Sequence, residues 1–475
     1  MHGQKREEYK ARFSNPEIAA KLEKKALQWN SLFSELLSRR GNLSSSSEVK
    51  IDIPKPSSLL HFEEADNDMR ALQKDGSKQN SDGTIKPKLQ PYLEITLALN
   101  SKLLLVNPDP LVLWNIRREL LLKSSSDKDT SDLFDLQIEL KVTTQCLERN
   151  PKAYGIWLHR KWTLQHYLRK YCSQHDESNS INILQYELHL CKEFLNLDER
   201  NFHCWNYRRF VVSVMGVLEQ SKRCGDVSMK NLIIDGSWEW LQKDMDTLID
   251  SVVMGPQMVH PTINQSFALS SISTNSSGSK ISPILRTEWE YTTLKIQANF
   301  SNYSAFHYRS KLLPLLVQQD VDQMKINENE TIPWYDIYNQ KLQYAQDELE
   351  LIHQAIFTEP DDQTAWWYHR FILDSFLSPP SMEQNEDEDN EGNLENLQSL
   401  YIELLQSELE QLQELIEIED GNCKWGLLAT HMTYGKLRIV MVEDDEAYKQ
   451  EQWNCLDTLM EIDPDRKKRY ESMKK

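Results

Sequence analysis

The sequence predicts an all-α fold, an α-solenoid of repeated helical hairpins that is interrupted by polar loop insertions. An aromatic residue is followed three residues later by arginine five times along the chain, and this spacing places both side chains on one face of a helix. The five pairs are Trp114/Arg117, Trp157/Arg160, Trp205/Arg208, Phe306/Arg309 and Trp367/Arg370. The segments between the pairs have the apolar spacing of amphipathic helices, and we find no run of alternating residues typical of strands.

A short block of turn-forming and capping residues precedes each pair. The blocks are Asn107-Pro108-Asp109, Asn150-Pro151-Lys152, Asp198-Glu199-Arg200, Asn299-Phe300-Ser301 and Glu359-Pro360-Asp361. Asn and Asp favour the N-cap of a helix, and Pro favours its first position. We therefore expect each motif helix to begin within its block.

Further helices are expected between and after the pairs. The segments Leu342 to Ile356 and Leu397 to Ile418 are amphipathic, with many Leu, Glu and Gln residues. Near the C-terminus, Lys424-Trp425 opens a degenerate copy without the arginine, and Asp463-Pro464 opens a terminal helix. Atypical end repeats cap many solenoids, so we interpret both as the C-terminal cap of the array.

Polar, low-complexity tracts fall between the pairs. We predict one helical array over residues 1–470, with insertions at about 41–88, 262–283 and 378–396. Common solenoids use about 35–45 residues for a helix pair, so the longer gaps should contain loops. The longest gap follows Trp205 and contains a helical pattern at Trp238 to Val253. It is either an enlarged loop or an additional degenerate hairpin.

Charge and composition exclude some classes of function. With 54 Lys+Arg against 73 Asp+Glu, the formal net charge is −19, so nucleic acid is not an expected partner. The motif helices nevertheless carry basic pairs: Arg117-Arg118, Arg160-Lys161 and Arg208-Arg209. These pairs indicate either an anionic ligand or acidic partner, or arginines that bridge helices.

The seven cysteines form no CxxC pair and no metal-ligand spacing. They are Cys146, Cys172, Cys191, Cys204, Cys224, Cys423 and Cys455. Their odd number and scattered positions favour reduced thiols in the cytoplasm. The chain contains no apolar run of about 18 residues, so it predicts neither secretion nor a membrane span.

Two positions differ between the copies in a way that indicates a ligand. Five residues before the motif aromatic lie Asp109, Lys152, Arg200, Ser301 and Asp362. A cation in the first turn of a helix costs roughly 0.3–1 kcal/mol because it opposes the helix dipole. Lys152 and Arg200 are understandable if an anion binds beside the free N–H groups there.

A histidine marks the second position. Two residues before the motif aromatic lie Val112, Gly155, His203, Ser304 and Ala365. Equivalent helices of a solenoid pack about 8–10 Å apart, so Lys152 and His203 could reach one diphosphate, with Tyr154 as a further hydroxyl donor. The alternative from the residues alone is that Lys152 is solvated, that His203 is structural, and that Tyr154 packs as Phe202 and Tyr303 would.

The repeats resemble those of protein prenyltransferase α subunits. The resemblance rests on Asn150-Pro151-Lys152-Ala153-Tyr154-Gly155-Ile156-Trp157-Leu158-His159-Arg160, Asn201-Phe202-His203-Cys204-Trp205-Asn206-Tyr207-Arg208-Arg209 and Asn302-Tyr303-Ser304-Ala305-Phe306-His307-Tyr308-Arg309. Within the family, the Met1-His2-Gly3 start and the Lys424-Trp425 and Asp463-Pro464 segments are most similar to the geranylgeranyltransferase type II branch, which modifies Rab GTPases. On the same resemblance we expect no proline-rich leader and no immunoglobulin-like or leucine-rich module.

The resemblance implies a right-handed crescent of hairpins wrapped around a β subunit, with the active site at their junction. The β subunit would hold the catalytic zinc and the lipid pocket, and a Rab escort protein would present the Rab protein. This chain would supply Lys152 and His203 as catalytic donors to the diphosphate of geranylgeranyl diphosphate, with Tyr154 beside them. Enzymatic activity would then require the heterodimer.

Three alternatives remain open from the sequence. His2, on the N-terminal tail, could reach the zinc of the β subunit as a ligand. The chain could instead be the α subunit shared by farnesyltransferase and geranylgeranyltransferase type I. It could also be a non-catalytic α-solenoid that only binds proteins along one face.

Overall fold

The computed structural model describes residues 16–44, 89–126, 133–171, 177–224, 283–324, 332–380, 391–441 and 444–474. These residues are helical apart from short turns and connections, and none of them lies in a β-strand. The predicted all-α fold is confirmed. The chain divides into two compact units, Met1–Gln174 and His175–Lys475.

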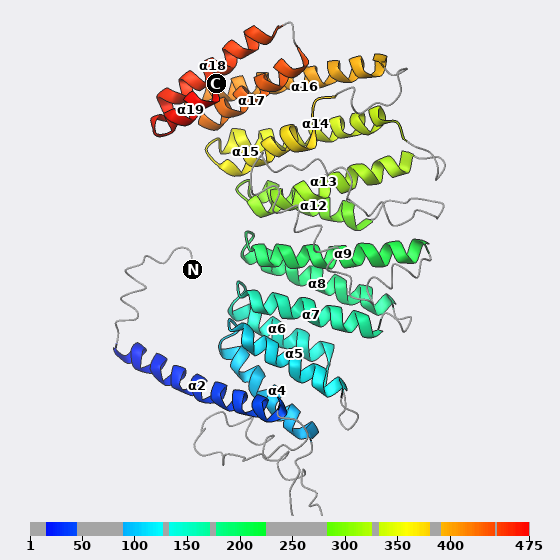
Figure 1. Ribbon diagram of the computed structural model, residues 1–475, viewed down its shortest axis with the longest axis vertical. Helices are drawn as coiled ribbons and strands as arrows, with labels where there is room; N and C mark the ends of the chain where they lie inside the picture. Colours follow the sequence, from blue (N-terminus) through cyan, green and yellow to red (C-terminus); the bar gives the residue numbers. More distant parts are fainter. Residues whose placement is uncertain are drawn as a thin grey trace, which may run out of the picture. The chain divides into compact units, whose positions relative to one another are not determined.

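The first unit contains the blue and cyan helices of Figure 1. Its helices are α2 (Pro16–Ser44), α4 (Leu89–Val106), α5 (Leu111–Ser126), α6 (Leu136–Arg149) and α7 (Tyr154–Tyr171). Helix α2 packs on α4, and the pairs α4/α5 and α6/α7 form hairpins. In each hairpin the first helix is called the leading helix and the second, which carries the repeated aromatic residue, the motif helix.

The second unit continues the same arrangement (Figure 1). Its hairpins are α8 (Glu177–Leu197) with α9 (Phe202–Cys224), α12 (Pro283–Ala298) with α13 (Tyr303–Met324), α14 (Trp334–Thr358) with α15 (Gln363–Arg370), and α16 (Glu391–Ile418) with α17 (Lys424–Val440). A π-helical turn, Phe371–Phe376, extends α15. Helices α18 (Asp445–Ile462) and α19 (Lys467–Met473) follow α17. The predicted helices at 342–356, at 397–418 and at the C-terminus are therefore confirmed.

A buried indole fixes the turn of most hairpins. The Nε1 atoms of Trp114, Trp157 and Trp205 each donate a hydrogen bond of 2.7–2.8 Å to the carbonyl oxygen six residues earlier. In the fifth copy this bond comes from Trp366, which donates to Pro360 at 2.8 Å. The predicted pair Trp367/Arg370 is therefore wrong by one residue, because Trp366 and His369 occupy the motif positions.

The motif helices begin later than predicted. Asn150 is the C-cap of α6, and α7 begins only at Tyr154, so Pro151 and Lys152 form the turn between the helices. Arg200 likewise precedes the first residue of α9. The expectation that these two cations lie in the first turn of a helix is wrong, because proline at this point is equally compatible with a turn. The dipole argument for an anion therefore does not apply to Lys152 and Arg200.

The residues that cap the motif helices come just after the predicted blocks. Asn201 and Asn302 accept hydrogen bonds through Oδ1 from the backbone N–H groups of Cys204 and Ala305. Asp362 accepts the N–H of Thr364 at 2.7 Å as the N-cap of α15. A side-chain oxygen at this position satisfies one of the unpaired N–H groups of the first turn.

Most of the predicted insertions lie outside the described residues, as do the possible extra hairpin at 238–253 and residue 2. Two predicted insertions overlap helices at one end. Helix α2 continues to Ser44 and α16 begins at Glu391, so residues 41–44 and 391–396, which were predicted to be loop, are helical. The prediction of a single array over 1–470 stays a prediction. Among the helices described, none is both long enough and apolar enough to cross a membrane.

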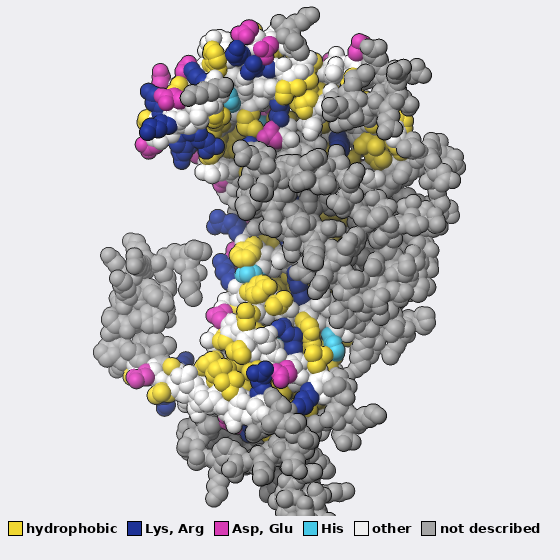
Figure 2. All heavy atoms as spheres, viewed as in Figure 1, with side chains coloured by type: hydrophobic (Ala, Val, Ile, Leu, Met, Phe, Trp, Pro, Cys, Tyr) yellow, Lys and Arg dark blue, Asp and Glu magenta, His cyan; other side chains and the backbone are white. Residues whose placement is uncertain are grey.

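Charged side chains of both signs are dense at the C-terminal end of the second unit. Figure 2 shows Lys and Arg side chains over α18 and α19 interspersed with Asp and Glu side chains. The cations exposed there include Arg466, Lys467, Lys468 and Arg469.

Candidate functional site

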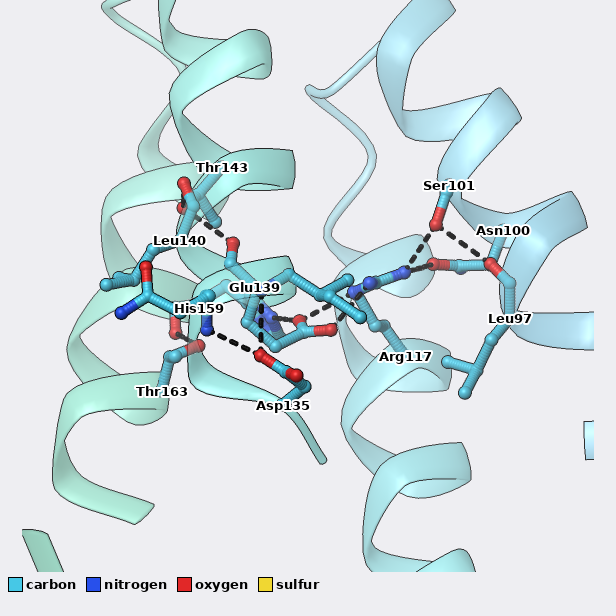
Figure 3. A network of polar contacts seen from close by, with 12 residues as sticks. Leu97, Asn100, Ser101, Arg117, Asp135, Glu139, Leu140, Thr143, His159 and Thr163 are labelled. Carbon is cyan, nitrogen blue, oxygen red and sulfur yellow. Dashed lines mark hydrogen bonds and ion pairs between the residues drawn. The ribbon is translucent and has the colours of Figure 1, made fainter. Parts of the chain in front are cut away.

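A buried glutamate joins the two hairpins of the first unit (Figure 3). Glu139 on α6 accepts two hydrogen bonds from Arg117 on α5, Nε to Oε2 at 2.7 Å and Nη2 to Oε1 at 2.6 Å. His159 on α7 contacts the same carboxylate, with Nε2 2.9 Å from Oε2. Burial opposes ionisation of Glu139, but the hydrogen bond from His159 and the charge of Arg117 lower its pKa to about 2. The motif arginine therefore ties its own hairpin to the next leading helix.

The same arrangement recurs twice in the second unit. Arg208 forms a bidentate ion pair with Glu288, and Arg309 forms one with Glu348, at 2.6–2.8 Å. Tyr308 and Tyr368 donate hydroxyl hydrogen bonds to these two carboxylates, as Tyr207 does to Glu187. Glu288 and Glu348 thus each have an opposite charge and a further hydrogen bond, which is the condition for tolerating burial.

The last junction replaces arginine with histidine. His369 Nε2 lies 2.8 Å from Glu408 Oε1, and His353 Nε2 lies 2.8 Å from Oε2. Burial would raise the pKa of Glu408, but the charge and hydrogen bonds of the two histidines lower it to about 2. The carboxylate is therefore ionised and shared between α14, α15 and α16.

The basic pairs of the motif helices differ in their contacts. Arg117 and Arg208 bridge hairpins, whereas Arg160 donates within its own hairpin to Leu140, Thr143 and Thr144. Of the second cations, Arg118 donates to Asn115, and Arg209 donates to Asn206 at 3.2 Å. The bridging interpretation is therefore confirmed for Arg117 and Arg208, and an anionic ligand or acidic partner at these pairs stays a prediction.

Lys152 lies in a turn that is held by several hydrogen bonds. The Lys152 N–H donates to Asn150 Oδ1 at 3.3 Å, the Asn150 amide donates to Asp109 Oδ1 at 2.8 Å, and Trp157 donates to the Pro151 carbonyl. The Lys152 side chain is exposed on this turn. Tyr154, two residues further along, is the first residue of α7, and its side chain is 53 % exposed. A fixed turn thus presents an ammonium group and a phenol to the surface.

Gly155 allows this turn to approach its neighbour closely. A Cβ atom at Gly155 would lie 2.7 Å from Cδ1 and 2.9 Å from Nε1 of Trp114. Trp114 is fully buried and donates to the Pro108 carbonyl, so its ring has little freedom to move. The small residue at this motif position therefore sets how the turn of Lys152 packs on α5.

His203 occupies the second residue of α9 in the other unit. Its imidazole is half-buried, and its ring centroid lies 3.9 Å from that of Phe202, which is 66 % exposed. Burial lowers the pKa of His203, so the ring is neutral at pH 7. A neutral imidazole can donate one N–H, and a bound anion would favour its protonation.

The structure places Lys152 and Tyr154 in the first unit and His203 in the second. A shared ligand for these three residues stays a prediction. His2 lies outside the described residues. Within the described ranges, no group of His, Cys, Asp and Glu has the arrangement of a metal site.

Sequence reasoning missed the buried glutamates. Each of Glu139, Glu187, Glu288 and Glu348 lies 20 residues before the histidine or tyrosine that contacts it. A constant spacing of this kind is visible in the sequence. Glutamates on amphipathic helices are usually solvated, so their spacing alone does not indicate buried ion pairs.

A scan against protein-family models matches the hairpins described above. The model described as "Protein prenyltransferase alpha subunit repeat" matches residues 136–167, 184–215, 285–316 and 345–376. Each match contains most of a leading helix and the first part of the following motif helix. The four matches therefore coincide with the four hairpins α6/α7, α8/α9, α12/α13 and α14/α15.

Curated relatives are similar over much of the chain. A protein from Candida albicans named geranylgeranyl transferase type-2 subunit alpha is 28 % identical over 392 residues, covering 80 % of this chain and 85 % of the relative. A Mus musculus protein of the same name is 32 % identical over 283 residues, covering 59 % of this chain and 34 % of the relative. The chain thus spans about a third of the length of the mouse relative.

The chain is also weakly similar to a solved structure. It is titled "Candida albicans protein geranylgeranyltransferase-I complexed with GGPP", with 14 % identity and a TM-score of 0.38, covering 90 % of this chain and 98 % of that chain.

Proposed function

Because this chain belongs to the protein prenyltransferase α-subunit family, we propose that it is the α subunit of a heterodimeric geranylgeranyltransferase of type 2. In this proposal it transfers geranylgeranyl, together with a β subunit, from geranylgeranyl diphosphate to C-terminal cysteines of Rab GTPases in the cytoplasm. A Rab escort protein presents the Rab substrate. The observation that carries the proposal is the similarity over 80 % of the chain to a relative named for the type-2 enzyme.

The chemistry proposed for this chain is stabilisation of the leaving group. A cysteine thiolate attacks C1 of the geranylgeranyl group, the S–C bond forms, and the C1–O bond to the diphosphate breaks. Negative charge therefore grows on the diphosphate in the transition state. Donors placed beforehand at that position lower the barrier, and removing one such donor commonly costs about 10²–10³-fold in rate.

Three side chains are proposed as these donors. Lys152 supplies a cation from the turn between α6 and α7, and Tyr154 supplies a hydroxyl from the first residue of α7. His203 supplies an imidazole N–H from the second residue of α9. The exposure of Lys152 and Tyr154 supports the proposal, because a side chain that meets a ligand must be accessible in the isolated chain.

Zinc is assigned to the β subunit in this proposal, and the metal would hold the substrate cysteine as a thiolate. The described part of this chain has no cluster of ligands that fits a metal ion. His2 is retained as a possible tail ligand to the zinc of the β subunit. Deletion of residues 1–5 tests it: an unchanged apparent affinity for the protein substrate would remove His2 from the proposal.

The experiment that tests the function is co-expression with a type-2 β subunit, followed by an assay of geranylgeranyl transfer to a Rab protein with its escort. The variants are Lys152→Ala, His203→Ala and the double variant, with Lys467→Ala on α19 as an exposed control. We expect each site variant to lower kcat more than lipid affinity, the double variant to lower it further, and the control to match wild type. Farnesyl transfer to a CaaX protein with a farnesyltransferase β subunit would favour the shared α subunit instead.

Two results would contradict parts of this proposal. If the heterodimer forms and transfers lipid at the same rate in all variants, Lys152 and His203 are not catalytic and this chain only scaffolds the β subunit. If wild type forms no heterodimer and supports no transfer, the proposed function is wrong. A binding measurement with diphosphate, read by the imidazole proton resonances of His203, adds a test that does not depend on turnover: bound diphosphate should raise the pKa of His203.

A further inference from the structure

The turn that carries Lys152 is joined to the preceding turn through the side chain of Asn150. Asn150 accepts the backbone N–H of Lys152 through Oδ1 at 3.3 Å, and its Nδ2 donates to Asp109 Oδ1 at 2.8 Å. Asp109 lies in the turn before α5, where its own N–H donates to Asn107 Oδ1 at 3.2 Å. Both turns belong to the first unit. The hydrogen bond from Asn150 to Asp109 is called the turn bridge.

Lys152 has contacts with the preceding hairpin on both sides along the chain. The turn bridge begins two residues before it, and three residues after it Gly155 lies so close to Trp114 that an added Cβ would be 2.7 Å from Cδ1. A lysine side chain is long and flexible, so the place that its ammonium group reaches depends on where the backbone is held. The turn bridge holds the N-terminal side of that backbone, and the glycine contact holds the C-terminal side.

Another copy of the repeat shows that the turn itself does not require an amide. Asp198 occupies the position of Asn150 in the turn before α9, and its Oδ1 accepts the N–H of Arg200 at 3.3 Å, the same distance as in the Lys152 turn. An ionised carboxylate can only accept, so Asp198 cannot donate as the Asn150 amide does. Asparagine at residue 150 therefore supplies a donor beyond what the turn needs.

The same use of an amide recurs in the second unit. Asn299 accepts the N–H of Ser301 at 2.8 Å and donates through Nδ2 to Glu199 in the preceding turn. Ser301 in turn donates to Glu359 at 2.9 Å and to Asp362, which lie in the turn before α15. Hydrogen bonds between successive turns are thus a built feature of the hairpins, and the turn bridge places one of them directly on the backbone of a proposed diphosphate donor.

We propose that Asn150 and Asp109 are positioning residues for the transfer reaction, and that the turn bridge holds the Lys152 ammonium group where charge develops on the leaving diphosphate. The inference rests on the proposed function and adds two residues that act only through Lys152. Electrostatic stabilisation requires a donor to be in place before the charge develops. A misplacement of about 1 Å can cost on the order of 100-fold in rate.

The turn bridge should matter more for catalysis than for folding. Asp109 is exposed and Asn150 is half-buried, so water can replace either partner when the bond is lost. The indole of Trp157 still donates to the Pro151 carbonyl at 2.8 Å, which preserves the turn. Loss of the turn bridge therefore loosens the N-terminal side of the turn without unfolding it. A purely structural role predicts the reverse, a lower Tm with an unchanged kcat of the folded heterodimer.

Two pairs of variants separate the hydrogen bond from the charge. Asn150→Asp copies Asp198: it keeps the acceptor for the Lys152 N–H and removes the donor to Asp109. Asn150→Asp/Asp109→Asn exchanges donor and acceptor, so the bridge can form again at the net charge of wild type. Asp109→Ala and Asp109→Asn both remove the charge, but only the second keeps an acceptor for Asn150.

The control is a bond of the same kind away from the proposed donors. Ser301→Ala breaks the hydrogen bonds between the turns before α13 and α15, and neither turn carries Lys152, Tyr154 or His203. Each variant is assayed as the full-length heterodimer with a type-2 β subunit. The measurements are kcat, the Kd of geranylgeranyl diphosphate and the Tm of the α chain.

We expect Asn150→Asp and Asp109→Ala to lower kcat about three- to tenfold, the range for loss of one hydrogen bond, with smaller changes in Kd and Tm. Asn150→Asp/Asp109→Asn and Asp109→Asn should recover most of the rate, and Ser301→Ala should match wild type. In a Lys152→Ala background, Asn150→Asp should change kcat by less than about twofold, because a positioning residue acts through the residue that it positions.

Three results would overturn the inference while the proposed function stands. They are an unchanged kcat in Asn150→Asp and Asp109→Ala, an exchanged double variant no faster than Asn150→Asp, and a loss that persists in full in the Lys152→Ala background. In each case wild type still transfers lipid and Lys152→Ala is still slow. A Lys152→Ala variant as fast as wild type instead removes the inference together with the catalytic role of Lys152.

Discussion

The Nε2 atom of His159 lies 2.9 Å from Oε2 of Glu139, where the hairpins of the second unit place a tyrosine hydroxyl. His159 is fully buried, and its Nδ1 atom has no hydrogen-bond partner among the described residues. An ionised carboxylate can only accept, so Nε2 carries the proton and the imidazole is neutral at pH 7. Burial lowers the pKa of His159 to about 4, although Glu139 acts in the opposite direction.

The stability of the first unit should therefore decrease in mild acid. Between about pH 6.5 and pH 4 the unfolded chain binds a proton at His159 that the folded chain does not, so the free energy of unfolding falls as the pH drops. By pH 5 the loss is about 2 kcal/mol. His159→Tyr, which copies Tyr207, and the smaller His159→Gln should both remove this part of the pH dependence. Urea unfolding at pH 7 and pH 5 measures it, and an unchanged difference would contradict the assignment of a neutral, buried imidazole.

Removing one partner of a bridging ion pair should be far more costly than removing an exposed one. Glu348→Gln leaves the Arg309 guanidinium, 4 % exposed, without its counter-charge, and we expect a loss of about 3–5 kcal/mol. The matched control is Glu446→Gln, whose exposed carboxylate pairs with Lys449 at 3.1 Å and should contribute less than about 1 kcal/mol. Chemical denaturation measures both losses.

A double variant separates the charge from the packing. Arg309→Met/Glu348→Leu replaces both charged groups with apolar ones of similar size, and much of the loss should be recovered. If the double variant is as unstable as Glu348→Gln alone, the glutamate contributes through packing or through Tyr368 rather than through its charge.

Most of the fold follows from the sequence because the repeated residues are those that form its core. Trp114, Trp157 and Trp205 are buried, and each lies three residues after the first residue of a motif helix. Their spacing to arginine is local, so a periodicity argument finds it. The fifth copy has two adjacent tryptophans, each followed three residues later by a basic residue. The two tryptophans are distinguished only by a hydrogen bond seen in the structure, which Trp366 donates to the Pro360 carbonyl.

The sequence selects candidate site residues, whose role stays a prediction, but it does not give their local structure. Comparing the copies singled out Lys152 and His203, and Tyr154 was the neighbour of the first. The comparison could not place the start of α7, because Asn150 and Pro151 suit a helix C-cap followed by a turn as well as a helix start. The bridging glutamates depend on contacts between hairpins, which no short sequence window contains.

The two tryptophans of the fifth copy should differ in their effect on stability. Trp366 is 6 % exposed and its indole holds the turn before α15, so Trp366→Ala should cost about 3–5 kcal/mol. Trp367 is less buried, so Trp367→Ala should cost clearly less. Thermal unfolding of the two variants side by side provides the measurement. A larger loss for Trp367 would restore the register that the sequence first indicated.

The contribution of Lys311 to stability should depend on pH. Its pKa in the folded chain is about 8, below the ordinary value of 10.5, because of burial and Arg209. The folded state therefore releases a proton that the unfolded state keeps, and wild type becomes more stable as the pH rises from about 8 to about 10.5. Lys311→Met lacks this dependence, so its advantage over wild type should be largest below pH 8 and disappear near pH 10.5. Unfolding at pH 7.5 and pH 10 tests the sign, and a constant difference would mean that the Lys311 ammonium is not destabilised by burial.

Two glycine substitutions should have opposite effects, because one glycine meets a neighbouring ring and the other meets open space. At Gly155 a new methyl group would lie 2.7 Å from Cδ1 of Trp114 and 3.1 Å from Cδ2 of Leu111. The indole cannot retreat without breaking its bond to Pro108, so Gly155→Ala should cost about 1–3 kcal/mol. At Gly216, within α9, no atom lies within 4 Å of the added Cβ.

Gly216→Ala should therefore stabilise the chain by about 0.5–1 kcal/mol, the usual difference between alanine and glycine inside a helix. Because both variants make the same chemical change in a motif helix, the intrinsic helix preference favours alanine at both positions. Any loss at Gly155 must then come from the contact with Trp114. Differential scanning calorimetry should show a lower Tm for Gly155→Ala and a higher one for Gly216→Ala. Two increases would mean that the turn of Lys152 can move away from α5 at no cost, and that its packing on Trp114 does not fix the position of Lys152.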